Sequence, residues 1–89
     1  MPVISAFYGV AIMMFFFDDR RHKRPHVHAR FGEFEAIVSI SEGDVLEGDL
    51  PIPKMKLVQA WIEIHKDELM RDWRLAVAGQ PLLKIEPLR

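Results

Sequence analysis

Hydrophobic and polar positions alternate with a period of two in the first half of this 89-residue chain. After Pro25, the two faces of an extended segment carry different side chains, namely Val27, Ala29 and Phe31 on one face and His26, His28 and Arg30 on the other. A tight turn is expected at Gly32-Glu33, and the inward positions of the segment after it are Phe34, Ala36, Val38 and Ile40. Because side chains of a β-strand point to opposite faces in turn, this pattern predicts a hairpin with one buried face.

Two further segments extend the predicted sheet. The stretch from Val3 to Phe17 is rich in β-branched and aromatic residues, which predicts a core strand with Gly9 as a bulge or bend. A second turn is expected over Ser41 to Asp44, leading into a strand over Val45 to Leu50. The N-terminal half therefore predicts an antiparallel meander of about four strands.

The period of the pattern changes after Pro51-Ile52-Pro53. Apolar residues then form a helical stripe from Lys54 to Ala78 that ends at Gly79, and its members are Leu57, Trp61, Ile64, Leu69, Trp73 and Val77. A single helix of this length would span about 37 Å, which is long for so small a protein, so we expect a bend or break near His65. A short last strand is expected over Pro81 to Leu88.

These elements predict an α+β fold in which a sheet has one face covered by helix. A chain of 89 residues is expected to form a single domain over residues 1–89. The sequence contains no cysteine, which excludes a disulfide framework, a thiolate nucleophile and a cysteine-based zinc site, and fits the cytoplasm. The apolar run over residues 6–17 is shorter than the roughly 20 residues that span a bilayer, so no membrane association is expected.

Charge is concentrated in the stretch RRHKRPHVHARF, residues 20–31. It holds five of the 12 lysines and arginines, although the formal net charge of the protein is −1. These cations suit phosphate groups, and the candidate nucleic-acid-binding residues are Arg20, Arg21, Lys23 and Arg24, together with Lys54 and Lys56 at the start of the predicted helix. The alternative is a solvated loop between strands, in which the cations have no ligand.

The histidines of this stretch are candidates for chemistry. On one strand face, the rings of His26 and His28 would project about 6.5 Å apart, which allows a general acid and base at a phosphate with Arg30 stabilising the developing charge. The same spacing suits a divalent metal such as zinc, held by His26 and His28 with His22 or Asp19. In a purely structural role, the rings would cap loop carbonyls or line the sheet edge.

Six collinear pieces of the sequence resemble a small prokaryotic family known as domain of unknown function 4160. The pieces are MPVISAFYGVAIMMFF, PHVHARFG, GDVLEGDLP, LVQAWIEIHKDEL, DW and GQPLLKIEPL, so the resemblance runs from end to end. Members of that family usually contain Asp-His-x-Pro-Pro-His-aromatic-His followed by Ala-Glu. Here the loop before His26 is longer and more basic, Arg24 replaces the first proline, and Arg30 stands where an acid is common. The first histidine of the family falls on His22 or on Arg20.

The resemblance implies a small intracellular bacterial protein, and it supplies no established activity. Relatives are often encoded beside another small uncharacterised domain, in an arrangement similar to toxin–antitoxin pairs. The small protein encoded by the neighbouring gene is therefore an expected partner.

Three functions are compatible with these observations. The first, which we favour, is a toxin-like or accessory component of such a pair that acts on or binds nucleic acid, with RNA as the expected target. The second is a metal-binding module built on His26 and His28. The third is a non-catalytic domain that binds a protein through the edge of its sheet. Whether the protein is an enzyme is left open by the sequence.

Overall fold

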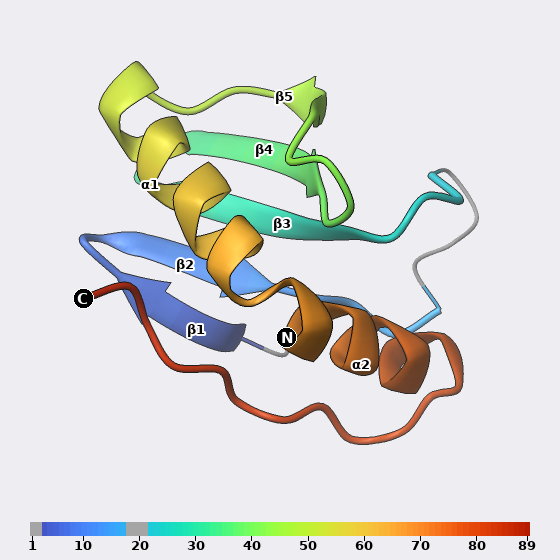
Figure 1. Ribbon diagram of the computed structural model, residues 1–89. Helices are drawn as coiled ribbons and strands as arrows, with labels where there is room; N and C mark the ends of the chain where they lie inside the picture. The colour runs from blue at the N-terminus through green and yellow to red at the C-terminus, as the bar shows by residue number, and fades with distance from the viewer. Residues whose placement is uncertain (1–2, 18–21) are drawn as a thin grey trace.

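The computed structural model of the protein describes residues 3–17 and 22–89. Within these residues, five strands form one antiparallel sheet in the order β1-β2-β3-β4-β5, and the helices α1 and α2 follow (Figure 1). Each strand pairs with its neighbour in the sequence, which confirms the predicted α+β fold and the antiparallel meander. The sheet has one strand more than the four or so that were expected.

The additional strand comes from the N-terminal segment, for which a single strand was wrongly predicted. Strand β1 (Val3–Phe7) and strand β2 (Val10–Met13) form a hairpin instead. The chain reverses at Tyr8 and Gly9, whose φ angles are 49° and 81°. Two successive left-handed residues make a two-residue hairpin turn, which favours Asn-Gly. Tyrosine is an unusual residue for the first position, so the sequence carried a turn signal at Gly9 alone.

The central strands agree with the prediction. Strand β3 (His26–Phe31) and strand β4 (Phe34–Ser39) are joined by the expected turn at Gly32-Glu33. The expected turn over Ser41–Asp44 leads into β5 (Val45–Gly48), and it is closed by a 2.8 Å hydrogen bond from Ser39 N–H to the carbonyl of Asp44.

The helical half is divided at the predicted place. Helix α1 (Ile52–Ile64) and helix α2 (Lys66–Val77) meet at His65, whose φ of −109° and ψ of 25° interrupt the helical geometry. The imidazole Nδ1 of His65 lies 2.6 Å from a carboxylate oxygen of Glu68, which fixes the junction. Helix α1 begins two residues before the predicted Lys54. Pro53 fits in the first turn of the helix, because the N–H group that proline lacks would have no helical partner at that position.

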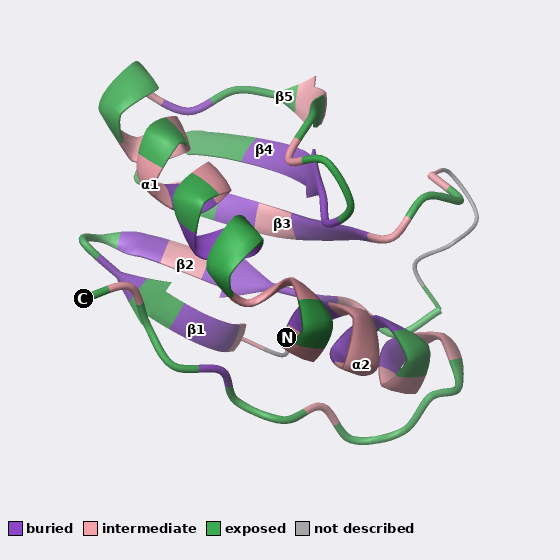
Figure 2. Ribbon diagram, in the orientation of Figure 1, coloured by how far each residue is buried: buried purple, intermediate pink, exposed green. Residues whose placement is uncertain are grey.

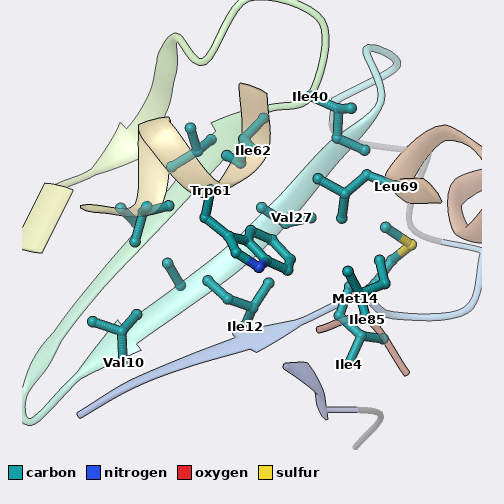
Figure 3. Packing of buried hydrophobic residues seen from close by; sticks show 14 of the residues in the cluster. Ile4, Val10, Ile12, Met14, Val27, Ile40, Trp61, Ile62, Leu69 and Ile85 are labelled. Atoms are coloured by element: carbon teal, nitrogen blue, oxygen red, sulfur yellow. The ribbon is translucent and has the colours of Figure 1, made fainter. Parts of the chain in front are cut away.

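The helices cover one face of the sheet, and the core lies between the two layers (Figures 1 and 2). Trp61 is completely buried, and Figure 3 shows its indole beside Ile12 and Val27 of the sheet. Two predicted core residues are wrong: Phe34 is 45% exposed and Ile64 is 65% exposed. Phe34 begins β4 at the end of the sheet, and Ile64 is the last residue of α1, so both lie where the opposite layer ends.

The predicted last strand over Pro81–Leu88 is also wrong. This C-terminal tail has no regular secondary structure, although Ile85 is buried and donates a 2.8 Å backbone hydrogen bond to the carbonyl of Ile4 in β1. Lys84 Nζ donates to the carbonyl of Val3, and the indole N–H of Trp61 donates to the carbonyl of Glu86. The tail lies along β1 through these separate contacts, and Pro81 and Pro87 each lack the N–H group that a strand ladder needs.

Candidate functional site

The predicted site residues His26, His28 and Arg30 lie on one face of β3, as their spacing indicated. The residues between them, Val27 and Ala29, are fully buried, so alternation turns the three polar side chains toward the opposite face, where Trp73 of α2 packs on His26. The ring centroids of His26 and His28 are 5.5 Å apart. The geometric part of the sequence prediction is therefore correct.

His26 is a buried residue that is only 1% exposed. Its Nδ1 lies 2.8 Å from the carbonyl oxygen of Arg24, and because a carbonyl can only accept, this nitrogen carries the proton and donates it. The imidazole also packs against the indole of Trp73 in α2, with ring centroids 4.9 Å apart. In this arrangement His26 joins the start of β3 to α2, and a substrate does not reach its ring from solvent.

His28 and Arg30 share a carboxylate that the sequence analysis did not include in the site. Glu35 of β4 is the Cα partner of Arg30, and its Oε1 accepts hydrogen bonds from Arg30 Nη2 and Nε at 2.9 and 3.3 Å. The other oxygen, Oε2, lies 3.6 Å from Nδ1 of His28. The hydrogen bond from Arg30 is the main cause that lowers the pKa of Glu35, with His28 adding to it.

The resemblance led us to expect an acid at position 30, where this chain has arginine. Glu35, the strand partner of Arg30, places a carboxylate beside this position. The turn at Gly32-Glu33 fixes Arg30 opposite Glu35. The turn and the strand pattern together place position 35 opposite position 30, so the sequence contained the information needed to identify Glu35.

A third imidazole extends the row. The rings of His22 and His26 are 5.6 Å apart, and Nε2 of His22 lies 3.4 Å from Oε1 of Glu47 in β5. Phe15 closes the other side, with its ring edge-on to His28 at 4.5 Å between centroids. The rings of His22, His26 and His28 are therefore successive neighbours, with Glu47 beside His22 and Glu35 beside His28.

The predicted nucleic-acid-binding cations are not brought together. Arg24 lies at the end of the sheet that holds the β4–β5 turn, where its guanidinium is 3.2 Å from the carboxylates of both Glu42 and Asp44. Lys54 lies at the opposite end, where its Nζ donates to the carbonyl of Tyr8 at 2.9 Å and sits 4.9 Å from the ring centroid of Phe31. Lys23 and Lys56 are exposed on these two separate ends. Arg20 and Arg21 fall outside the described residues.

The metal hypothesis receives no direct support from the geometry. Within residues 3–17 and 22–89, no group of three or more histidine, aspartate or glutamate side chains is arranged to hold a metal ion, and no pocket is found. Asp19, one of the four predicted ligands, falls outside the described residues. Zinc binding by His22, His26 and His28 stays a prediction.

Comparison with known proteins places the chain in a family. Residues 9–74, from the β1–β2 turn to nearly the end of α2, match the family described as Domain of unknown function (DUF4160). The chain belongs to this family. The match includes the histidine row, the whole of α1 and most of α2, and it leaves out β1 and the C-terminal tail. Neither a curated protein nor a solved structure matches the chain. Among the described residues, no helix combines the length and apolarity that crossing a membrane requires.

Proposed function

We propose that this DUF4160 protein is a non-catalytic accessory component of a bacterial, cytoplasmic toxin–antitoxin-type pair, and that it binds its partner protein through the β5 edge of its sheet. The expected partner is the small protein encoded by the neighbouring gene. The observation that carries the proposal is a difference between the two edges of the sheet. The C-terminal tail contacts β1, whereas no strand within residues 3–17 and 22–89 pairs with the outer side of β5.

The β1 edge is covered by the C-terminal tail. Ile85 N–H and Lys84 Nζ take up the carbonyls of Ile4 and Val3, so two acceptors of this edge are already satisfied within the chain. The tail also buries Ile85 against the core. A partner strand cannot pair here without displacing these contacts.

Among the described residues, β5 is the last strand on its side of the sheet. Among the described residues, no backbone hydrogen bond is found on the outer side of this strand. Glu47 lies opposite Ile37, and Asp49 N–H donates to the carbonyl of Glu35, so the backbone groups of Gly48, between these two pairs, point away from β4. Unpaired groups on an edge strand accept an added strand, and this is a common way in which proteins bind extended segments.

The histidine row supports a binding role better than catalysis. His26 is buried, and Arg30 is held by Glu35, so neither is directed at a substrate. Arg24 is likewise occupied by two carboxylates. These carboxylates compete with a phosphate for the two guanidinium groups, although the ion pairs are exposed and each contributes little to stability. RNA binding is therefore the competing prediction, and the same experiment tests it.

The test measures the affinity of the full chain for the neighbouring protein by calorimetry. Val45 of β5 is 43% exposed, and a lysine there places a charge on the edge, which opposes strand addition. We expect Val45→Lys to weaken binding at least tenfold, while Val45→Thr, which keeps a β-branched side chain, binds like the wild type.

Equal affinities for the two variants, or no binding by the wild type, contradict the proposal. A parallel titration with single-stranded RNA separates the alternatives. RNA binding that weakens steeply with salt, with a slope reduced by Lys23→Gln and Arg24→Gln, supports the nucleic-acid function instead.

A further inference from the structure

The β1–β2 turn contains a residue that its backbone conformation disfavours. Tyr8 has a φ of 49°, in the left-handed region that asparagine and glycine accept and that an ordinary side chain populates unfavourably. The ring returns little to the fold, because Tyr8 is 56% exposed. The position suits asparagine, but it is occupied by a large aromatic residue whose side chain is mostly exposed to solvent. This combination indicates that the ring contacts something outside the folded chain.

The turn holds Tyr8 in a fixed position. Lys54 Nζ donates to the Tyr8 carbonyl at 2.9 Å, and the same ammonium lies 4.9 Å from the ring centroid of Phe31. Gly9 packs on that ring as well, since a Cβ placed on it would lie 3.1 Å from Cε1 of Phe31. An aromatic side chain on a braced backbone loses little conformational freedom on binding, which is typical of residues that dominate interfaces.

Other exposed apolar residues surround Tyr8. Phe34 is the Cα partner of Phe31, so its side chain lies on the same face of the sheet, and Ile52 begins α1. These two residues are 45% and 72% exposed. Figure 1 shows that the β1–β2 turn, the start of β4 and the first turn of α1 lie at the same end of the sheet, and in Figure 2 the ribbon of these three segments is mostly in the colour of exposed residues. We call Tyr8, Phe31, Phe34, Ile52 and Lys54 the Tyr8 end.

The charges around the Tyr8 end indicate what it binds. Glu33, Asp49 and Lys56 are exposed, and among the described residues none of them forms an ion pair. Two free carboxylates oppose a nucleic acid. A rim that carries both signs is complementary to itself when two copies meet about a two-fold axis, because each surface then offers a cation to the other's anions.

We propose that two copies of the chain associate through the Tyr8 end. The exposed parts of its large side chains provide about 300 Å² of apolar surface, which is the size of the functional patches found on monomeric proteins. A standard stable interface buries about 800 Å² on each partner. The association is therefore weak and depends on concentration, and this surface is separate from the β5 edge.

The experiment is sedimentation of the purified full chain over a wide concentration range. The weight-average mass of the wild type rises toward that of a dimer, with a dissociation constant on the order of 100 μM, as expected for a small interface. Tyr8→Asn suits the turn, so it folds, and it stays monomeric at concentrations where the wild type pairs. Tyr8→Phe keeps the ring and continues to self-associate.

A matched control is available on the same helix. Ile64 is 65% exposed, comparable to Ile52, but it lies 12 residues further along α1, about 18 Å away at 1.5 Å per residue. Ile64→Asn removes about as much exposed apolar surface as the loss of Ile52 would, and we expect it to leave self-association unchanged. A wild type that is monomeric throughout, or equal weakening by Tyr8→Asn and Ile64→Asn, overturns the proposal. Val45→Lys tests the β5 edge independently, because it leaves the Tyr8 end intact.

Discussion

Replacing Gly48 by alanine is expected to damage β5 more than a change in backbone preference explains. Gly48 has a φ of 73°, and a Cβ built on it would overlap the backbone oxygen of Glu35 and lie 3.3 Å from Cα of Ala36. Both atoms belong to the backbone of β4, so they cannot rotate away as the end of a flexible side chain does. Either β4 and β5 separate, or Gly48 leaves its left-handed conformation, and each outcome breaks pairing.

Gly32 provides the matched comparison. Its φ is 59°, but a Cβ there would have no neighbouring heavy atom within 4 Å. Gly32→Ala therefore carries the left-handed penalty alone, about 1–2 kcal/mol. Gly48→Ala carries a similar penalty plus the collision, and overpacking of this kind costs about 1–3 kcal/mol more. For a protein of this length, whose total stability is about 4–13 kcal/mol, the second variant loses a large part of its margin.

Urea unfolding of both variants at 25 °C measures the difference, with similar m-values as the condition for comparing the free energies of unfolding. Hydrogen exchange adds a local readout at the amide of Asp49, which donates to the carbonyl of Glu35 beside the predicted collision. That amide exchanges faster in Gly48→Ala and keeps its protection in Gly32→Ala. Equal destabilisation by the two substitutions would falsify the steric argument. The expected loss of β5 pairing also predicts weaker partner binding by Gly48→Ala.

Three further predictions concern other parts of the fold. Trp73→Ala is expected to lower the free energy of unfolding by about 3–5 kcal/mol, and an unaltered urea midpoint contradicts this. Because the indole covers His26, the same variant should speed the reaction of that imidazole with a histidine-modifying reagent. Burial raises the pKa of Asp72 above 3.8, so its contribution to stability is complete below that pH and is lost as the pH rises through the folded-state pKa. Asp72→Asn should therefore flatten the pH dependence of urea midpoints, and an unchanged profile counts against the assignment. Tyr8→Asn should exceed Tyr8→Ala in stability by about 1 kcal/mol, because both remove the ring and only asparagine tolerates the left-handed turn; equal melting temperatures refute it.

The sequence by itself determined the elements with strong local signals. Alternation fixed β3 and β4, and the turn at Gly32-Glu33 fixed their pairing, since a shift of one residue would have exposed Val27 and Ala29. The change of period after Pro53 fixed the helical half. The excessive length of a single helix predicted the break at His65. Each of these conclusions depends on neighbouring residues, and such signals can be recognised without knowledge of the rest of the chain.

Tertiary structure decided the features that depend on distant partners. The turn at Tyr8 has a residue that its conformation disfavours, so the hairpin is selected by the pairing of β1 with β2 and by Lys54 from α1. The tail resembles a strand in sequence, but its position is set by separate contacts to β1 and by the indole of Trp61.

The candidate site shows the same division. The sequence placed His26 and His28 on one face, because alternation is a local property of a strand. Whether each ring is exposed to solvent depends on the position of α2, because Trp73 of this helix covers His26. The carboxylate of Glu35 came from the facing strand. Local spacing therefore determined which side chains are neighbours, and only the packing of helix against sheet decided which of them are accessible.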